Sequence, residues 1–308
     1  MLADMTSNLP IYRFEVALEI KGDLKAPRFK GSMLRGAMGL QFKQAACVKQ
    51  DGDCDICPVT RSCPYFVCFE SRGLFEGNQR DVPHPYLINC RDERRNLSRG
   101  DLLIFDLVLM GNNVKSLPYF LFAFIRTGAG KGLTRRNIGF EVTGVLHRGT
   151  QIYDRETQCL REQLEPIPET VIEPQETKDL ILELVTPTRI RANKRFVGKE
   201  MEPLDFLKCL YHTLEGLEPY VGCLELPEKA EFFEKSADLQ IVERNLHWQP
   251  VIRHSNRQGK KIAMGGVMGS FRLQGEALKD LTPYLSLLPH INLGKNRVFG
   301  FGQVELRQ

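Results

Sequence analysis

The sequence lacks any apolar run long enough to cross a membrane, which takes about 20 consecutive apolar residues. Its N-terminus carries Asp4 and lacks the basic-then-apolar pattern of a secretory signal. The 308 residues hold enough apolar side chains for one large domain or two of ordinary size. We therefore expect a soluble, cytoplasmic protein, with two domains as the preferred organisation.

Acidic residues are absent from three windows of the chain, residues 24–50, 107–140 and 244–275, although the net charge is only +4. The acids are instead concentrated between Asp154 and Asp179. Segregation of this kind gives a nearly neutral protein a basic face, which is typical of proteins that bind a phosphate backbone. Clustering by chance is the alternative. The cations that we select from these windows as contacts to such a backbone are Lys30, Arg35, Lys43, Arg135, Arg136, Arg253, Arg257, Lys260 and Lys261.

Several catalytic patterns are missing. The glycine-rich segment 128–132 contains Lys131 but lacks the spacing of a nucleotide-binding phosphate loop. No Ser-His-Asp arrangement and no pair of catalytic carboxylates can be argued from spacing. The sequence therefore gives no support to a nucleotide hydrolase or to a serine hydrolase.

The cysteines are odd in number, nine, and five of them fall between residues 47 and 68. This pattern favours a metal site or reduced thiols over a disulfide framework. We predict that Cys47, Cys54, Cys57 and Cys63 bind a metal, because they surround a CxxC pair and a tetrahedral site needs four ligands. Structural zinc is preferred, an iron–sulfur cluster is the rival, and unligated thiols are the third possibility.

Hydrophobic periodicity predicts an α+β protein in which one order of elements occurs twice. In the first half, strands are expected at 12–20, 67–70, 85–89, 102–110 and 138–146, with helices at 32–46 and 117–126. In the second half, strands are expected at 180–190, 248–253, 262–273 and 298–306, with helices at 206–217, 228–238 and 278–288. Strand-helix-strand-strand-helix-strand is the order of a ferredoxin-like unit. We predict two tandem ferredoxin-like domains, residues 1–160 and 179–308, joined by a linker at 161–178, with the cysteine-rich insertion at about 47–68 in the first.

A glycine-rich turn, residues 293–302, precedes the last predicted strand. Its glycines allow tight turns and a close approach of another chain, and Lys295 and Arg297 add positive charge there. Phe299 and Phe301 share a face with polar residues, so an open sheet could stack unpaired bases on them. The alternative is that a neighbouring element covers both rings.

These segments resemble one family closely. Residues 253–261, the glycine pair at 265–266 and the glycine-rich turn are similar to the C-terminal domain of the CRISPR precursor-RNA processing endoribonucleases of the RAMP superfamily. Residues 31–36, the cysteine cluster and residues 132–136 are similar to the form of that family with a cysteine-bearing insertion. The resemblance covers nearly the whole chain and implies two ferredoxin-like domains with RNA-binding surfaces.

The resemblance implies cleavage of repeat RNA by its own 2′-hydroxyl, without a catalytic metal, to leave a 2′,3′-cyclic phosphate. It also implies CRISPR repeat RNA as a partner, other effector subunits as further partners, and retention of the product RNA. The family often places a histidine directly before the glycine-rich turn and another near the first helix, whereas this sequence has Asn292 and no histidine before His84. We therefore select His254 and His290 as the acid and base and Lys295 as the group that stabilises negative charge. The alternative is a catalytically silent RNA-binding subunit.

Overall fold

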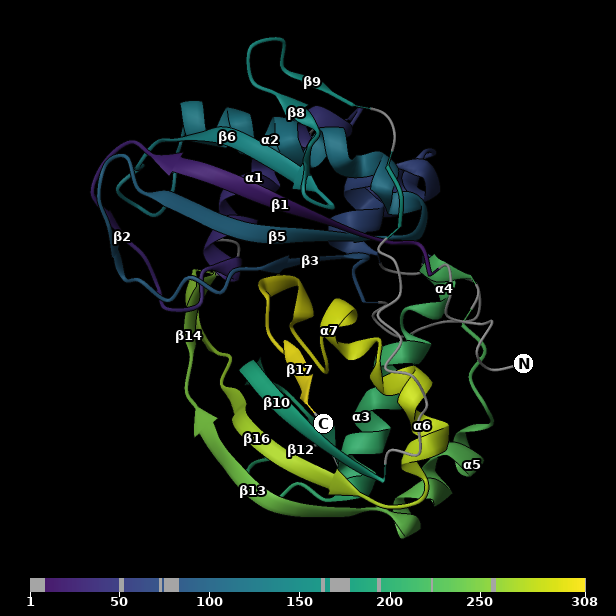
Figure 1. Ribbon diagram of the computed structural model, residues 1–308. Helices are drawn as coiled ribbons and strands as arrows, with labels where there is room; N and C mark the ends of the chain where they lie inside the picture. Colours follow the sequence, from purple (N-terminus) through teal and green to yellow (C-terminus); the bar gives the residue numbers. More distant parts are fainter. Residues whose placement is uncertain are drawn as a thin grey trace. The chain divides into compact units, whose positions relative to one another are not determined.

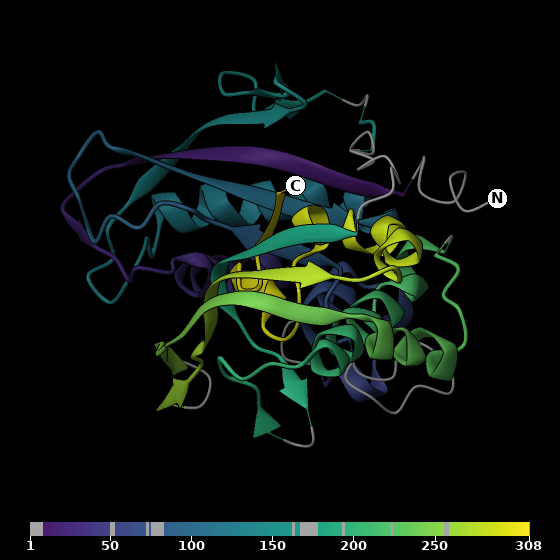
Figure 2. The same ribbon diagram turned by 60° about the horizontal axis from the view of Figure 1, so that its bottom comes forward.

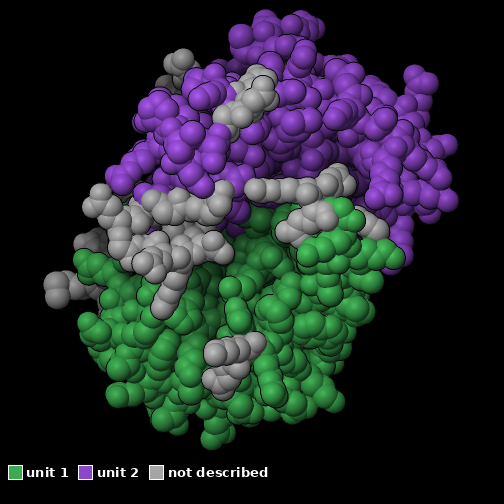
Figure 3. All heavy atoms as spheres, turned by 180° about the vertical axis from the view of Figure 1, so that it is seen from behind, with its two compact units in different colours: residues 1–9, 168–218, 222–308 green, residues 10–167, 219–221 purple. Residues whose placement is uncertain are grey.

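A computed structural model describes residues 9–49, 53–71, 74, 83–161, 164–166, 178–192, 195–222, 224–255 and 259–307. The chain divides into two compact units, which Figure 3 shows in different colours. Unit 2 comprises residues 10–167 with 219–221, and unit 1 comprises residues 1–9, 168–218 and 222–308. No helix of the described residues is both long enough and apolar enough to cross a membrane.

Unit 2 is built on an antiparallel sheet with the strand order β3-β5-β1-β6-β7 (Figure 1). Its strands are β1 (Ile11–Ile20), β2 (Leu24–Lys25), β3 (Tyr86–Asn89), β4 (Asn96–Leu97), β5 (Leu102–Met110), β6 (Phe140–His147), β7 (Thr150–Gln151), β8 (Tyr153–Asp154) and β9 (Cys159–Leu160). Its helices and helical turns are α1 (Gly31–Ala46), η2 (Cys54–Ile56), η3 (Thr60–Ser62), η4 (Phe66–Glu70), η5 (Gly111–Ser116) and α2 (Leu117–Ala129). Setting the short elements aside, the order is strand, helix, two strands, helix, strand.

Alternation along β1 decides which face of this sheet is covered. Phe14, Val16 and Leu18 are fully buried, whereas Glu15 between them is exposed. Successive strand residues point to opposite faces, so one face must pack against other elements. Helices α1 and α2 pack together and supply that cover, with Phe42 of α1 meeting Phe120 of α2 at a ring separation of 4.8 Å.

Unit 1 repeats the same plan with an antiparallel sheet in the order β13-β16-β10-β17 (Figure 2). Its strands are β10 (Asp179–Thr188), β11 (Arg191–Ala192), β12 (Arg195–Phe196), β13 (Gln240–Gln249), β14 (Ile252–Ser255), β15 (Lys260–Ala263), β16 (Gly266–Gln274) and β17 (Val304–Arg307). Its helices and turns are α3 (Pro203–Glu215), α5 (Lys229–Glu234), η6 (Lys235–Asp238), α6 (Leu278–Leu285), α7 (Leu288–Ile291) and η7 (Arg297–Phe299), and α4 (Glu218–Val221) lies where the two units' residue ranges meet.

Helix α3 shows how local sequence and packing agree in unit 1. Its first turn is a capping box, in which the side chains of Glu202 and Asp205 each accept a hydrogen bond from the other residue's backbone N–H. Pro203 occupies the first helical position, where its fixed φ is favourable. Phe206 then enters the core and meets Phe271 of β16 edge-on, at a ring separation of 5.5 Å.

The two units confirm the predicted fold class, two tandem ferredoxin-like domains in an α+β protein. Several elements differ from the expectation, among them the helix predicted at 278–288, which is divided into α6 and α7. Residues 67–70 form part of the helical turn η4 rather than a strand, because this segment folds back on itself with the N–H of Ser71 donating to the carbonyl of Phe66. Strand β13 begins at Gln240, ahead of the predicted hairpin, and the last strand starts at Val304 rather than at residue 298.

Candidate RNA-binding site

The glycine-rich turn is a rigid loop rather than the start of a strand. Its backbone enters the left-handed region at Gly294 (φ 84°), Asn296 (φ 67°), Gly300 (φ 74°) and Gly302 (φ 75°). A Cβ on Gly302 would lie 1.9 Å from the carbonyl oxygen of Leu293, so only glycine fits at that position. The N–H of Leu293 donates to the carbonyl of Gly302 at 2.7 Å and closes the loop.

Hydrogen bonds from neighbouring elements hold this loop in place. Thr186 of β10 donates its hydroxyl to the carbonyl of Gly300 at 2.8 Å and accepts from the N–H of Gln303 at 2.9 Å. Thr213 of α3 accepts from the N–H of Gly294 at 3.1 Å. The turn is therefore fixed to the end of β10 and to α3.

Lys295 is the cation that this loop presents to solvent. Its side chain is exposed, and within the described part of the chain no carboxylate lies within ion-pair distance of its ammonium. Its backbone N–H donates to the carbonyl of Arg189 at 3.1 Å, in an antiparallel bridge. A Cβ on Gly294 would lie 2.6 Å from the same carbonyl oxygen, so the glycine before Lys295 permits this approach.

Three other predicted contacts of the turn are buried. Arg297 is 5% exposed and donates from Nη1 to the carbonyl of Ile291 at 3.0 Å, so its charge supports the loop from inside. Phe299 and Phe301 are 8% and 2% exposed. The open, base-stacking face expected for these two rings is therefore wrong for this structure, and the alternative of covered rings holds.

The basic hairpin β14–β15 lies against the turn. The guanidinium of Arg253 sits over the ring of Phe299, with its Cζ 4.6 Å from the ring centroid. The hairpin pairs Arg253 with Ile262, His254 with Lys261 and Ser255 with Lys260 along the backbone, and both lysine side chains are exposed. Unit 1 thus brings the predicted hairpin and the predicted turn together, as expected of one binding surface. Arg257 lies outside the described residues, as does the side chain of His254.

The two positions that bear on proton transfer differ in their surroundings. His290 is half-buried on α7, whose last turn leads into the loop. Asn292 is fully buried, has a positive φ of 57°, and donates its side-chain amide to the carbonyl of Phe301 at 3.0 Å. Asn292 therefore has a structural role in closing the loop, while His290 remains the nearest titratable side chain before the turn.

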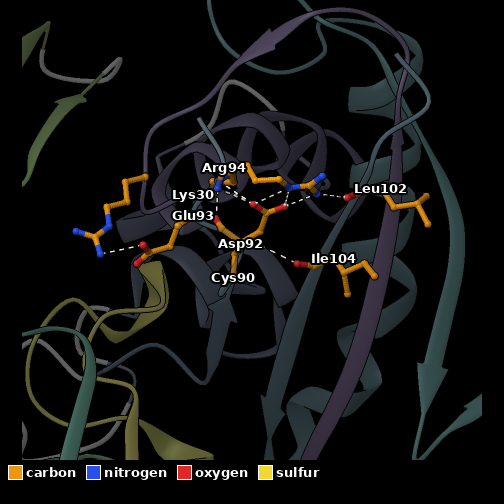
Figure 4. A network of polar contacts seen from close by, with 8 residues as sticks. Lys30, Cys90, Asp92, Glu93, Arg94, Leu102 and Ile104 are labelled. Carbon is orange, nitrogen blue, oxygen red and sulfur yellow. Dashed lines mark hydrogen bonds and ion pairs between the residues drawn. The ribbon is translucent and has the colours of Figure 1, made fainter. Parts of the chain in front are cut away.

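Lys30 of unit 2 does not face RNA in this structure. It is fully buried and donates from Nζ to the carbonyl of Asp92 at 2.5 Å, with the Asp92 carboxylate 3.6 Å away (Figure 4). Burial lowers the pKa of Lys30, and the attraction of Asp92 opposes that shift. Arg94 binds the same carboxylate and the carbonyl of Leu102, so Lys30 belongs to a structural network rather than to the predicted basic face.

The predicted cationic face of α1 packs against β3 and the residues in and beside η4. Arg35 donates from Nε to the hydroxyl of Tyr86 at 2.9 Å and lies 5.1 Å from the ring centroid of Phe69. Lys43 lies 5.6 Å from the ring centroid of Tyr65. A Cβ on Gly39 would be 3.3 Å from the Phe69 ring, so that glycine makes room for a side chain of the same unit.

Arg135 and Arg136 are exposed, as predicted for cations that contact a ligand. They lie in a turn closed by the bridge between Leu133 and Ile138. Thr134 and Asn137 in this turn have positive φ values. The turn presents both guanidiniums at the surface of unit 2, and neither has an ion-pair partner within the described ranges.

The four cysteines predicted to bind metal all lie in one partly exposed segment. Cys54 and Cys57 flank a tight turn, and the hydroxyl of Thr60 lies 2.7 and 2.6 Å from their carbonyl oxygens. Burial raises the pKa of the Cys54 thiol, and nearby Glu70 adds to that effect. Four thiols are a suitable donor set for zinc. Within the described ranges, however, no three His, Cys, Asp or Glu side chains are grouped closely enough to hold a metal ion.

Two residues that were not among the predicted site residues have defined positions. Arg189 lies beside Lys295, and the acid-free run 184–199 around it would have identified it by the same signal as the other basic windows. The Nδ1 of His84 lies 3.0 Å from the hydroxyl oxygen of Ser71. That hydroxyl donates to the carbonyl of Val67 at 2.7 Å.

Comparison with known families matches both halves of the chain. Residues 9–165 match the N-terminal domain family AF_1859_N, and residues 182–304 match the family of the CRISPR-associated endoribonuclease Cas6. No curated protein sequence matches the chain significantly.

Solved structures share the fold. A Cas6 (TTHB231) product complex has a TM-score of 0.58 at 15% identity over 96% of this chain and 100% of that chain. Cas6 (TTHB231) of Thermus thermophilus has a TM-score of 0.51 at 14% identity, over 96% of this chain and 99% of that chain. A partial Cas6-RT-Cas1–Cas2 complex has a TM-score of 0.58 at 14% identity, over 98% of this chain but only 47% of that chain.

Proposed function

We propose that the chain cleaves CRISPR repeat RNA and keeps the product bound, because residues 182–304 match the family of the CRISPR-associated endoribonuclease Cas6. The observation that carries this proposal is Lys295, an exposed cation on a loop held by hydrogen bonds from Thr186 and Thr213. A fixed positive charge stabilises a developing anion best, because the protein does not have to reorganise during the reaction.

The reaction is an attack within the RNA. The 2′-oxygen forms a bond to the adjacent phosphorus, the bond from phosphorus to the 5′-oxygen breaks, and the products are a 2′,3′-cyclic phosphate and a 5′-hydroxyl. A base takes the proton of the 2′-hydroxyl, an acid gives a proton to the departing 5′-oxygen, and a cation stabilises the charge on the non-bridging oxygens. No metal is needed in this scheme.

The residues proposed for these roles come from unit 1. Lys295 stabilises the phosphorane, and His254 and His290 serve as the acid and base. Lys260 and Lys261 of the hairpin and Arg253 contribute RNA contacts next to the turn. Arg135 and Arg136 of unit 2 are proposed as further contacts, because both are exposed.

The second candidate function is a catalytically silent RNA-binding subunit of a CRISPR effector complex. Asn292 favours it, because its buried amide closes the loop and supplies no group for proton transfer. The partial complex named above combines Cas6 with RT, Cas1 and Cas2. Association of this chain with other CRISPR proteins is therefore proposed for either function.

Incubation with repeat RNA in EDTA separates the two functions. The enzyme is expected to yield product ending in a 2′,3′-cyclic phosphate, identified by mass spectrometry. Replacing an acid or base costs about 10²- to 10⁴-fold in rate, so His254→Ala and His290→Ala are expected to cleave slowly while still binding RNA. His212→Ala is the matched control, because His212 is exposed on α3 and paired with Glu215. Tight binding with intact RNA would leave only the silent subunit.

We also propose that Cys47, Cys54, Cys57 and Cys63 hold a structural zinc ion, with an iron–sulfur cluster as the alternative. The proposal rests on the four thiols and the tight turn at Cys54 and Cys57. Gathering the four sulfurs around a metal requires the segment to rearrange from the conformation described. In this role the metal would hold the segment together and take no part in cleavage.

A further inference from the structure

Arg189 and Lys295 face each other directly across an antiparallel bridge. Side chains of such a pair lie on the same side, with Cβ atoms about 4.5–5.5 Å apart. Like charges in this arrangement repel and destabilise the pairing. The N–H of Lys295 nevertheless bonds to Arg189, and Gly294 is the residue that lets the chains meet there. The fold therefore holds two cations together at the base of the glycine-rich turn.

The guanidinium of Arg189 is held in place but is not neutralised. Its Cζ lies 4.0 Å from the ring centroid of Phe196, and its Nη1 makes one long contact of 3.4 Å to the carbonyl of Ala263. Its Nε is buried without a hydrogen-bond partner among the described residues. Burial alone lowers the pKa of Arg189, because no described carboxylate compensates for the lost hydration.

A buried donor without an acceptor is costly, so it calls for an explanation. Nε and Nη2 form the edge of a guanidinium that makes two parallel hydrogen bonds to a phosphate. In Arg189 it is the other nitrogen, Nη1, that contacts Ala263. The edge suited to a phosphate is thus the one left without a partner in the described structure.

Further unpaired cations surround this pair. Arg191 and Arg195 lie on the small hairpin β11–β12 that also carries Phe196, and both are exposed. The hairpin β14–β15 contacts Arg189 through Ala263 and carries the exposed Lys260 and Lys261. Within the described part of the chain, none of these four cations has an acidic partner. Two basic hairpins and the turn therefore meet at Arg189.

We propose that Arg189 and Lys295 jointly bind one phosphodiester of the RNA and that Phe196 holds the guanidinium in the orientation this requires. The inference rests on the proposed function, and it adds a phosphate-binding residue and a positioning residue to the site. The bound phosphate would offset the repulsion between the two cations and accept from Nη2, and the buried Nε could donate to it only once that edge of the guanidinium opens to solvent. A planar guanidinium matches a phosphate better than the point charge of a lysine does.

Binding of single-stranded oligouridine tests the assignment, because a phosphate contact is independent of base sequence. Arg189→Ala in the full chain is expected to weaken binding about tenfold, since it removes hydrogen bonds to a charged group. The slope of log Kd against log salt is expected to fall by about 0.7, the value for one phosphate of a single strand. Arg189→Lys is expected to recover the slope but not the full affinity.

Arg307→Ala is the matched control. Arg307 is also in unit 1 and exposed, but it is paired with Glu183 and Glu305, so the variant loses the same formal charge from a neutralised site. Its affinity is expected to stay within about twofold of the wild type, because exposed ion pairs contribute little. An equal loss in both variants would reduce the effect to net charge and overturn the proposal.

The role of Phe196 is tested by a different measurement, because Phe196 is proposed to act by positioning Arg189 and carries no charge itself. Phe196→Ala is expected to weaken binding without changing the salt slope, since the charge is still present. Phe196→Tyr, which keeps the aromatic face, is expected to restore the affinity. A loss in Phe196→Ala that tyrosine does not restore would contradict the positioning role.

The outcomes also distinguish this proposal from the proposed function. Cleavage of repeat RNA by wild type together with unchanged oligouridine binding by Arg189→Ala would overturn the phosphate site and leave the function in place. Wild type that binds no RNA would overturn both. A polyglutamate peptide that binds equally tightly, and loses affinity in Arg189→Ala, would assign the site to carboxylates instead. Melting temperatures of all variants within the wild-type range exclude unfolding as the cause.

Discussion

At the scale of single residues, glycines occur in this protein at positions with different structural requirements. Gly294 has a φ of 84°, and a Cβ there would lie 2.6 Å from the carbonyl oxygen of Arg189. Gly36 is exposed inside α1, and a Cβ there would meet nothing within 4 Å. The first is required by a turn and a close approach, whereas the second costs helix stability without any contact to explain it.

Replacement of Gly294 and of Gly36 by alanine is therefore expected to change the free energy of unfolding in opposite directions. Gly294→Ala should lower the free energy of unfolding by about 1–3 kcal/mol and weaken RNA binding, because the backbone must shift and the turn is strained. Gly36→Ala should raise it by about 0.5–1 kcal/mol through helix propensity, with RNA binding unchanged. Urea unfolding measures the stability of each variant, and oligouridine binding measures its affinity for RNA. A Gly294→Ala protein as stable as wild type would refute the account of the turn.

At the scale of elements, the cysteine-rich segment contains two kinds of thiol. Cys47, Cys54, Cys57 and Cys63 are partly exposed along this segment. Cys68 on η4 is fully buried, and burial raises its pKa to about 12. Thiolates rather than thiols react with alkylating agents and bind metals, so Cys68 is the least suited of the five to either.

Metal content and alkylation together test the zinc proposal. Protein purified without chelator is expected to hold one zinc per chain and to be colourless. Its four partly exposed cysteines should resist iodoacetamide until the metal is removed, after which they should react, because bound thiolates are not free nucleophiles.

The exposed Cys159 is the control that should react in both states, and Cys68 should react in neither without denaturant. Iron and sulfide with a visible absorption band would assign a cluster instead. Metal-free protein whose four cysteines react at once would leave only unligated thiols.

At the scale of the whole molecule, the chain carries two separate hydrophobic cores. Phe206 and Phe271 meet in unit 1 at a ring separation of 5.5 Å, and Phe105 and Phe124 meet in unit 2 at 5.1 Å. All four rings are at most 2% exposed. Each unit therefore has the interior packing that an independent ferredoxin-like domain requires.

Truncation of one core should act mainly on its own unit. Phe206→Ala and Phe124→Ala are each expected to cost about 3–5 kcal/mol through lost burial and the cavity left behind. Hydrogen exchange followed by peptide mapping should show lost protection in unit 1 for the first variant and in unit 2 for the second. Equal losses in both units for either variant would show a single cooperative core and contradict this division.

The sequence by itself determined the secondary structure that depends on periodicity. Alternation along residues 11–20 and 102–110, and helical spacing in α1, α2 and α3, appear in the structure close to the predicted bounds. Hydrophobic spacing works there because each residue's burial is set by neighbours two to four positions away. The order of those elements was enough to predict two ferredoxin-like domains. The glycine-rich turn and the basic hairpin were also evident, because glycine and clustered charge are local signals.

Only the tertiary structure decided which of these residues face solvent and which meet one another. Lys30 and Arg297 count as cations in the sequence, yet both are buried and bonded to backbone carbonyls. Phe299 alternates like a surface residue, yet it lies under Arg253. Arg189 and Lys295 are far apart in the chain and become neighbours through an isolated bridge between the residue after β10 and the turn. Contacts of this kind depend on the packing of distant segments, which no local pattern encodes.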